Sequence, residues 1–271
     1  DLARVYGTVP YSALPSVAAS RDAIVWTANN KMYAGHPALR LSAQFAPPYR
    51  AYRIAQLLRA RTRYDAAYFT GMQMDVLSLP ERELARELVA HGAAGDAAAS
   101  SLLARWDGRM SGGSVAATIV ERWRLALTAG HNGRLPSVLF ASRRGARFAL
   151  PAIASPQPWA VAGAIPVTHA LASLGITMLD GTTFPGNGDA FTLHMQSLAK
   201  SGADSQSFRA VWDVGNWDAG GISLPQGESG EPGSGHYTDQ AADWIAGRLL
   251  PLPFSAAAVD RAAAHRLVLA P

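Results

Sequence analysis

The sequence predicts an α+β fold, in which strand-like segments near both ends flank a long helical middle. Residues 23–27 are rich in β-branched and aromatic side chains, which favour a strand. From residue 56 to 130 apolar side chains recur at helical spacing, whereas apolar and polar side chains alternate at strand spacing in residues 191–195 and 208–214. We therefore expect a helical unit inserted between two strand-containing parts of the chain.

The first expected elements are a strand and a strongly basic helix. The predicted strand ends at Asn29-Asn30, a pair of turn-forming residues, which places Asn29 at the strand end. Pro47-Pro48 precedes a segment of helical periodicity and predicts that a helix begins there. Its apolar face holds Ala51, Ile54, Leu57 and Leu58, and its basic face holds Arg50, Arg53, Arg59 and Arg61. We expect the first face to pack and the second to meet solvent.

Three more helices are expected in the middle of the chain. Their periodicity predicts them at residues 64–76, 80–90 and 115–127, the second ending at Gly92. Between residues 130 and 185 Pro and Gly become frequent and the periodicity weakens. Only residues 167–174 are expected to form a short helix in that connection.

The last third of the chain is expected to mix strands and short helices. Trp212 is in phase with Phe208 and Val214 in the second predicted strand, so we expect Trp212 in the core. The later elements are a Gly-rich loop at 215–235, helices at 237–246 and after Ser255, and a final strand at 266–269. Positive φ angles are expected in the loop at Gly227, Gly230, Gly233 and Gly235.

Composition excludes several classes of function. The chain has 271 residues, of which 49% are hydrophobic and 16% charged, so it can bury a substantial core. Its formal charge of +4 comes from scattered arginines without basic blocks, so neither a nucleic-acid partner nor a membrane partner is expected. The absence of cysteine excludes disulfides, thiolate metal sites and a cysteine nucleophile.

The motifs of several large enzyme classes are absent. The sequence has no Walker loop, dinucleotide fingerprint, HExxH pair or GxSxG elbow. The seven histidines are too dispersed for the spacing of metal ligands, so no metal and no cofactor are predicted. Ser229, His236 and Asp239 lie close in sequence, but triads arise by convergence in space, so we do not interpret these residues as a triad. We expect Asp239 in the first turn of the helix that follows.

Eight short segments, taken in order and spacing, resemble the C-terminal part of the β chain of the penicillin acylase (penicillin amidase) family of N-terminal nucleophile hydrolases. They are Trp26–Asn30, Pro48–Leu58, Gln73–Ser78, Arg105–Gly108, Pro185–Asp189, Ser207–Asp213, Gly227–Gly230 and His236–Gln240. No single segment is specific to the family, whereas their order and spacing together are. The resemblance extends over most of the chain.

The resemblance implies hydrolysis of an amide by an N-terminal serine whose own α-amine acts as the general base, directly or through a water. In that family an asparagine that follows a strand donates a hydrogen bond to the tetrahedral oxyanion, and Asn29 matches this position. An arginine just before the helix holds that asparagine and the amino terminus in place, and Arg50 matches this position. This reading requires Asn29 and Arg50 to lie close together.

The resemblance also implies that the chain is incomplete. Asp1 cannot be the nucleophile, because that role needs Ser, Thr or Cys. The expected partners are therefore the remaining α chain and the N-terminal portion of the β chain of the same precursor, and the chain alone is expected to be inactive. The substrate is expected to be a small-molecule acyl amide, such as a β-lactam side chain or an acyl-homoserine lactone.

The family's fold would be a four-layered αββα sandwich. Residues 1–55 and 185–271 would be its strand-containing parts, and residues 56–184 a mainly helical subdomain with a Pro/Gly-rich connection. The family's calcium site uses a carboxylate between the asparagine and arginine positions, but residues 30–49 contain no Asp or Glu. Export of family members implies a periplasmic or secreted location. The rival hypothesis is a noncatalytic secreted binding module that uses the Trp/Gly-rich loop 212–235, with Trp217 in contact with a glycan or peptide.

Overall fold

The computed structural model describes residues 9–17, 20, 23–33, 44–90, 97–129, 153, 156–199 and 202–269. Its helices are α1 (Tyr49–Arg59), α2 (Ala66–Gln73), α3 (Leu79–Ala90), α4 (Ala97–Ala104), α5 (Val115–Thr128), α7 (Trp159–Ala162), α8 (Ala241–Ala246) and α9 (Ala256–Ala262). Short 3-10 helices are η1 (Tyr11–Ala13), η2 (Ala170–Leu174) and η3 (Trp217–Ala219). The strands are β1 (Gln196–Ala199), β2 (Gly202–Ser205), β3 (Arg209–Val211), β4 (Gly221–Ser223) and β5 (Leu250–Pro251). The predicted mixture of helices and strands is confirmed.

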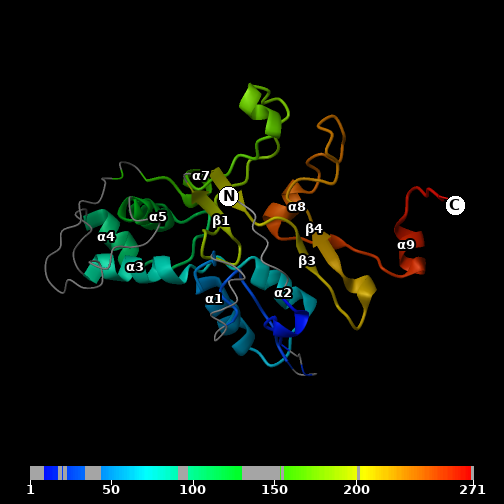
Figure 1. Cartoon of the computed structure of the whole chain (residues 1–271). Coiled ribbons are helices and arrows are strands. Elements are labelled where there is room, and N and C mark those ends of the chain that lie inside the picture. The colour runs from blue at the N-terminus through cyan, green and yellow to red at the C-terminus, as the bar shows by residue number, and fades with distance from the viewer. Residues whose placement is uncertain are drawn as a thin grey trace.

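The elements form a helical end and a strand-containing end (Figure 1). Helices α3, α4 and α5 gather at one end, whereas β3, β4 and α8 lie at the other, with α9 farthest out (Figure 1). Helices α1 and α2 lie between these two groups. The division at residues 55 and 185 stays a prediction. Among the described residues, no helix has the length and apolar character needed to cross a membrane.

Residues 23–27 do not form the predicted strand. They run without a ladder partner among the described residues, and Ile24 and Val25 are exposed. A strand needs a neighbour to satisfy its backbone N–H and C=O groups, so strand-forming side chains alone do not produce one. The segment ends at Asn29, the single described residue other than glycine with a positive φ, at 60°.

The predicted helices are mostly confirmed. Helix α1 begins directly after Pro48 and buries Ala51, Ala55 and Leu58, as its periodicity requires. Helix α2 is shorter than predicted and begins after Asp65, whose carboxylate accepts a hydrogen bond from the N–H of Tyr68 at 2.7 Å. Helices α3 and α5 match their predicted segments, whereas Gly92 lies outside the described residues. Helices α4 and α7 have no counterpart in the predictions.

The main core lies where α3, α4, α5 and α7 meet. It is built from Leu84, Leu88, Leu103, Met110, Ile119, Val120, Trp123 and Trp159, with several alanines between them. Trp159 is fully buried, and its indole Nε1–H donates to the backbone oxygen of Gly188 at 2.8 Å. This bond ties the helical end to the turn at residues 187–196, which leads into β1.

The strands form two small antiparallel sheets. Strand β1 pairs with β2, and β3, β4 and β5 form the second sheet in that order. The alternating residues 191–195 were predicted as a strand, but β1 begins only at Gln196. In these residues turn contacts prevail over the alternating pattern, since the Thr192 Oγ1 accepts from the N–H of Asp189 at 2.8 Å.

The predicted orientation of the next strand is wrong. Strand β3 buries Arg209 and Val211, whereas Phe208, Trp212 and Val214 are exposed, Trp212 by 50%. Arg209 selects the inward face because its guanidinium donates to the carbonyl of Trp244 and to the His194 ring, the latter at 3.1 Å. A buried cation with several hydrogen bonds thus prevails over the apolar alternation of the strand.

The C-terminal predictions are only partly confirmed. Helix α9 follows Ser255, whose Oγ accepts from the N–H of Ala258 at 3.2 Å, as expected of a helix after Ser255. Helix α8 begins at Ala241 rather than 237, so Asp239 lies before it and not in its first turn. Residues 266–269 form no strand and are exposed. Like residues 23–27, they have no partner strand among the described residues.

Glycines outside the predicted loop adopt the left-handed conformation. The glycines with positive φ are Gly108, Gly175, Gly188 and Gly247, and none of the four predicted glycines is among them. Gly227 is needed for close approach instead, because a Cβ there would lie 2.1 Å from the backbone oxygen of His236. Close approach of the backbone, and not a positive φ angle, therefore requires a glycine at Gly227, whereas the Cβ positions of Gly230, Gly233 and Gly235 have nothing within 4 Å.

Gly188→Ala should destabilise the protein strongly. Gly188 has a φ of 88°, and a Cβ there would lie 1.9 Å from the backbone oxygen of His194. We expect a loss of about 3 kcal/mol or more in the free energy of unfolding, measured by urea denaturation. The control is Gly113→Ala, because nothing lies within 4 Å of its Cβ position. Equal stability of the two variants would contradict the role assigned to Gly188.

His194 should make the protein less stable in mild acid. Burial first, and the positive charge of Arg209 second, lower the pKa of His194 to about 3. The neutral imidazole therefore contributes fully to the free energy of unfolding above the unfolded-state pKa. This contribution is lost as the pH falls from about 6.5 towards 3, by about 1.4 kcal/mol per pH unit.

Urea denaturation at several pH values measures this slope. His194→Gln should lose it, and the comparison with wild type removes contributions from other titrating groups. His265→Gln, at an exposed position in the C-terminal tail, should keep the wild-type slope. A slope unchanged in His194→Gln would refute the assignment.

Candidate functional site

Asn29 and Arg50, 21 residues apart, meet in the structure. The Arg50 Nη2–H donates to the Asn29 Oδ1 at 3.1 Å. Asn29 is exposed and Arg50 half-buried, and burial lowers the pKa of the Arg50 guanidinium from its usual value. The two residues that the sequence singled out therefore lie together, as the amidohydrolase hypothesis requires.

The backbone around Asn29 is held from both sides. The N–H of Ala28 donates to the Asn30 Oδ1 at 3.2 Å, and the carbonyl of Asn29 accepts from the N–H of Ala46 at 2.9 Å. Asparagine tolerates the left-handed conformation better than most residues, which suits a φ of 60°. These contacts fix the direction in which the Asn29 side chain projects from the backbone.

The contact with Arg50 determines what the Asn29 amide can do. A guanidinium only donates hydrogen bonds, so it engages the amide oxygen and leaves the two N–H bonds of Asn29 Nδ2 for another group. Fixed N–H donors of this kind stabilise an oxygen on which negative charge develops. The pair is therefore chemically suited to binding an oxyanion.

A pocket of ≈ 740 Å³ opens beside this pair. Asn29 and Arg50 line it together with residues of the 23–28 segment, α1, α2 and β3. Most of the lining is apolar, including Trp26, Ile54, Leu58, Phe69, Met72 and Trp212. An apolar wall with a few convergent polar groups is typical of small-molecule sites.

Two glutamines also line the pocket, and sequence reasoning did not single them out. The Gln73 Nε2–H donates to the backbone oxygen of Ala210 at 3.0 Å, and the Gln206 Nε2–H donates to the backbone oxygen of Gln73 at 3.3 Å. They join α2 to β3 and to the connection between β2 and β3 at one side of the pocket. Gln73 begins one of the eight resemblance segments, which is the one sequence signal that pointed to it.

A buried ion pair holds the helix that carries Arg50. One turn further along α1, Arg53 donates from Nε to Asp75 Oδ1 at 3.0 Å and from Nη2 to Asp75 Oδ2 at 2.7 Å. Asp75 also accepts from the N–H of Leu77 at 3.1 Å. The bidentate geometry and the low exposure of both side chains fix the rotation of α1, and therefore the position of Arg50.

Ser229, His236 and Asp239 do not form a triad. The His236 Nδ1 contacts the Asp239 Oδ2 at 2.8 Å, but the Ser229 Oγ accepts from the backbone N–H of Glu231 at 3.0 Å. His236 is exposed, and its hydrogen bond with Asp239 raises its pKa. Trp217 is partly exposed and lies against Phe254, with ring centroids 5.3 Å apart. The exposure of Trp217, together with that of Trp212 in the same loop, is what the binding-module hypothesis rests on.

Comparison with known proteins gives two findings. The family model described as penicillin amidase matches residues 2–261. The chain is also 30% identical, over an alignment of 301 residues, to the penicillin acylase 2 proenzyme of Pseudomonas sp. (strain SE83). That alignment covers 92% of this chain, and the chain spans 39% of the length of the relative.

Asp75→Asn should release α1. The substitution leaves the Arg53 guanidinium without a counter-ion in a largely buried place, so we expect a loss of about 3 kcal/mol in the free energy of unfolding. Asp243→Asn is the matched control, because the Asp243–Arg248 pair is more exposed and should contribute about 1 kcal/mol or less. Urea denaturation measures both. An equal cost for the two substitutions would contradict the role given to Asp75.

Proposed function

This chain belongs to the penicillin amidase family, and we propose that it supplies the oxyanion-binding part of an N-terminal serine amidohydrolase. In this proposal the serine nucleophile and its α-amine lie in the remaining portion of the precursor. The substrate is a small-molecule acyl amide, such as a β-lactam side chain or an acyl-homoserine lactone. The observation that carries the proposal is the contact between Arg50 and the amide oxygen of Asn29.

The proposed role of Asn29 is to hold the oxyanion of the tetrahedral intermediate. The serine hydroxyl would attack the acyl carbonyl while the α-amine removes its proton. The carbonyl oxygen then gains negative charge and accepts a hydrogen bond from the Asn29 Nδ2, which stabilises the transition state more than the ground state. The same amine returns the proton to the leaving nitrogen, and water releases the acyl group in a second, equivalent cycle.

Arg50 is proposed as a positioning residue in this reaction. Its guanidinium holds the amide oxygen of Asn29, so the Nδ2 donors are already oriented before the substrate binds. Its positive charge also favours the neutral form of any nearby amine, which is the form that a general base needs. Both effects act at the open pocket of ≈ 740 Å³ that Arg50 lines.

We further propose that the remaining precursor completes an αββα sandwich around this pocket. Two features support a docking surface there: residues 23–27 have no ladder partner among the described residues, and Phe208 and Trp212, which flank β3, are exposed. Unpaired backbone and apolar side chains of this kind are stable when covered by further strands. Secretion to the periplasm or outside the cell is part of the proposal.

Asn29→Ala, introduced into the full precursor, should lower kcat for acyl-amide hydrolysis by about 100- to 1,000-fold with little change in KM. The reason is that the lost donor acts chiefly in the transition state. Steady-state kinetics measures both constants, and native mass spectrometry shows whether the matured chains still assemble. Full activity of an assembled Asn29→Ala enzyme would refute the proposed function.

Two controls sharpen this experiment. Asn216→Ala truncates an exposed amide in the loop used by the binding-module hypothesis, and it should leave kcat unchanged. The double variant Asn29→Ala with Arg50→Ala separates the two roles of Arg50. The part that acts through Asn29 should add no loss to that of Asn29→Ala, so any further loss measures the effect of the Arg50 charge on the amine. Fully additive losses would refute the positioning role.

A further inference from the structure

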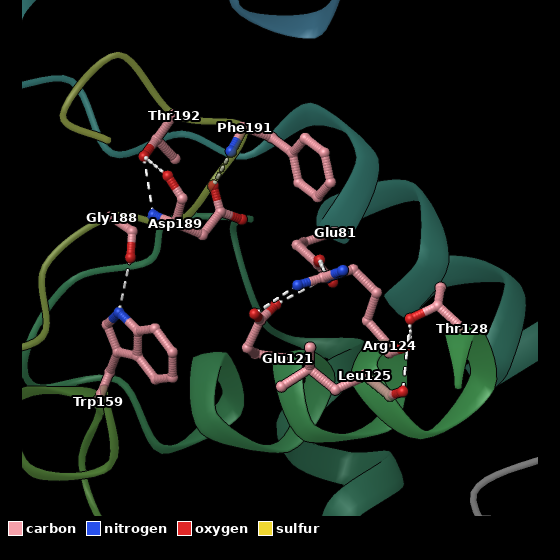
Figure 2. Close-up of polar contacts among 10 residues, drawn as sticks. All are labelled: Glu81, Glu121, Arg124, Leu125, Thr128, Trp159, Gly188, Asp189, Phe191 and Thr192. Carbon is pink, nitrogen blue, oxygen red and sulfur yellow. Dashed lines mark hydrogen bonds and ion pairs between the residues drawn. The ribbon is translucent and has the colours of Figure 1, made fainter. Parts of the chain in front are cut away.

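Three carboxylates from separate parts of the chain meet in the core of the helical end. Glu81 lies on α3, Glu121 on α5 and Asp189 in the turn before β1. One oxygen from each lies within 4.8 Å of the others. The three residues are almost completely buried, with exposed fractions of 0%, 2% and 1%. Figure 2 shows Glu81 and Glu121 at the guanidinium of Arg124, with Asp189 to one side of them.

Arg124 neutralises only part of this charge. Its Nε contacts the Glu81 Oε1 at 2.6 Å, and Nε and Nη2 donate to the two oxygens of Glu121 at 2.8 and 2.5 Å. Arg124 is the one cation that the described contacts bring to the cluster. Three ionised carboxylates and one guanidinium leave two negative charges in a buried place. Such charges are costly unless they are compensated.

Several oxygens around the cluster lack a hydrogen-bond donor. Glu81 Oε2, Asp189 Oδ2 and Ser78 Oγ are buried and make no hydrogen bond within the described structure. Ser78 is not an acid, is completely buried, and still lies close enough to Asp189 to lower the pKa of that carboxyl. Buried oxygens without partners are rare in native proteins, so these three indicate a place where protons or a cation bind.

The electrostatics of the cluster agree with this view. Burial first, and the charge of Glu121 second, raise the pKa of Asp189 to about 6 and raise the pKa of Glu81 well above its usual value. The ionised forms of Asp189 and Glu81 are thus destabilised by their surroundings. Two protons or one divalent cation would remove the excess charge.

We propose that Glu81, Glu121, Asp189 and the Ser78 hydroxyl hold one Ca²⁺ ion. All of the ligands are oxygens, which hard cations such as Ca²⁺ prefer. Oxygen ligands of one Ca²⁺ lie at most about 5 Å apart, since each Ca–O distance is about 2.3–2.6 Å, so the cluster already has the right dimensions. Mg²⁺ needs about 2.0–2.1 Å and an octahedral shell, which would require the cluster to contract.

The proposed ion would act as a structural link. It would connect α3, α5 and the turn at residues 187–196, which Trp159 already contacts through Gly188 (Figure 2). All of its ligands follow Arg50 in the sequence, so this set differs from the one in which the resemblance places a carboxylate between Asn29 and Arg50. The spacing of the histidines could not reveal this site, because its acidic ligands are carboxylates separated by 40 and 68 residues.

The test uses the matured protein assembled from its full precursor. Elemental analysis of the purified protein, and calcium titration by calorimetry after treatment with chelator, give the number of bound ions. Saturating Ca²⁺ at a 100-fold excess over Kd should raise the Tm by about 2 °C. Mg²⁺ at the same concentration should raise it less.

Three variants show where the ion binds. Asp189→Asn should bind one Ca²⁺ fewer and lose the Tm response, yet without calcium it should be at least as stable as wild type, because one buried charge is removed. Ser78→Ala, a milder change, should weaken calcium binding while keeping the fold. Glu83→Gln, on an exposed position of α3, should bind and respond as wild type does.

Several outcomes would overturn the proposal. A wild-type protein that binds no calcium at the cluster, with Asp189→Asn and wild type showing equal stoichiometry and Tm response, would show that protons neutralise the carboxylates. Another metal found in place of calcium would also refute it. Neither outcome bears on amide hydrolysis, which depends on Asn29 and is measured separately.

Discussion

The ion pair between Asp75 and Arg53 is the interaction on which the arrangement of the site depends. Asp75 follows α2, and its carboxylate reaches back to α1, while its backbone oxygen accepts from the N–H of His194 at 3.0 Å. One residue therefore joins α1, the α2–α3 connection and the turn that leads to β1. Arg50 lies one helical turn before Arg53, so its distance from Asn29 is set by this buried pair and not by surface contacts.

The turn at residues 187–196 carries this connection to the strand-containing end. His194 contacts Arg209 of β3, and Arg209 in turn donates to the carbonyl of Trp244 in α8. A guanidinium can only donate, so the Nε2 of His194 accepts and the imidazole is neutral. The neutral imidazole is tolerated beside the buried cation because its hydrogen bonds are complete. Protonation in acid would place a second positive charge next to Arg209, so this chain of contacts is sensitive to acid.

The sequence predicted local helices well and relations between distant segments less well. Helices α1, α3 and α5 follow from apolar periodicity, because each buries one face on its own neighbours. The orientation of β3 could not be predicted in this way, since Arg209 is buried through contacts with His194 and Trp244, which lie far from it in sequence. The carboxylate cluster was missed for the same reason. The Asn29–Arg50 contact was expected from the family resemblance and not from the spacing of the two residues.

The geometry of Asn29 explains why an amide is suited to the role proposed for it. An asparagine has no charge to titrate, so its donor strength stays constant with pH and its effect on a developing oxyanion depends on position alone. Position is fixed here at a cost, because a positive φ is unfavourable for residues other than glycine. The hydrogen bonds at Ala28 and Ala46 and the contact with Arg50 offset that cost before any substrate is present. Because the donors need no reorganisation during the reaction, the arrangement that strains the backbone is the one that would lower the barrier to hydrolysis.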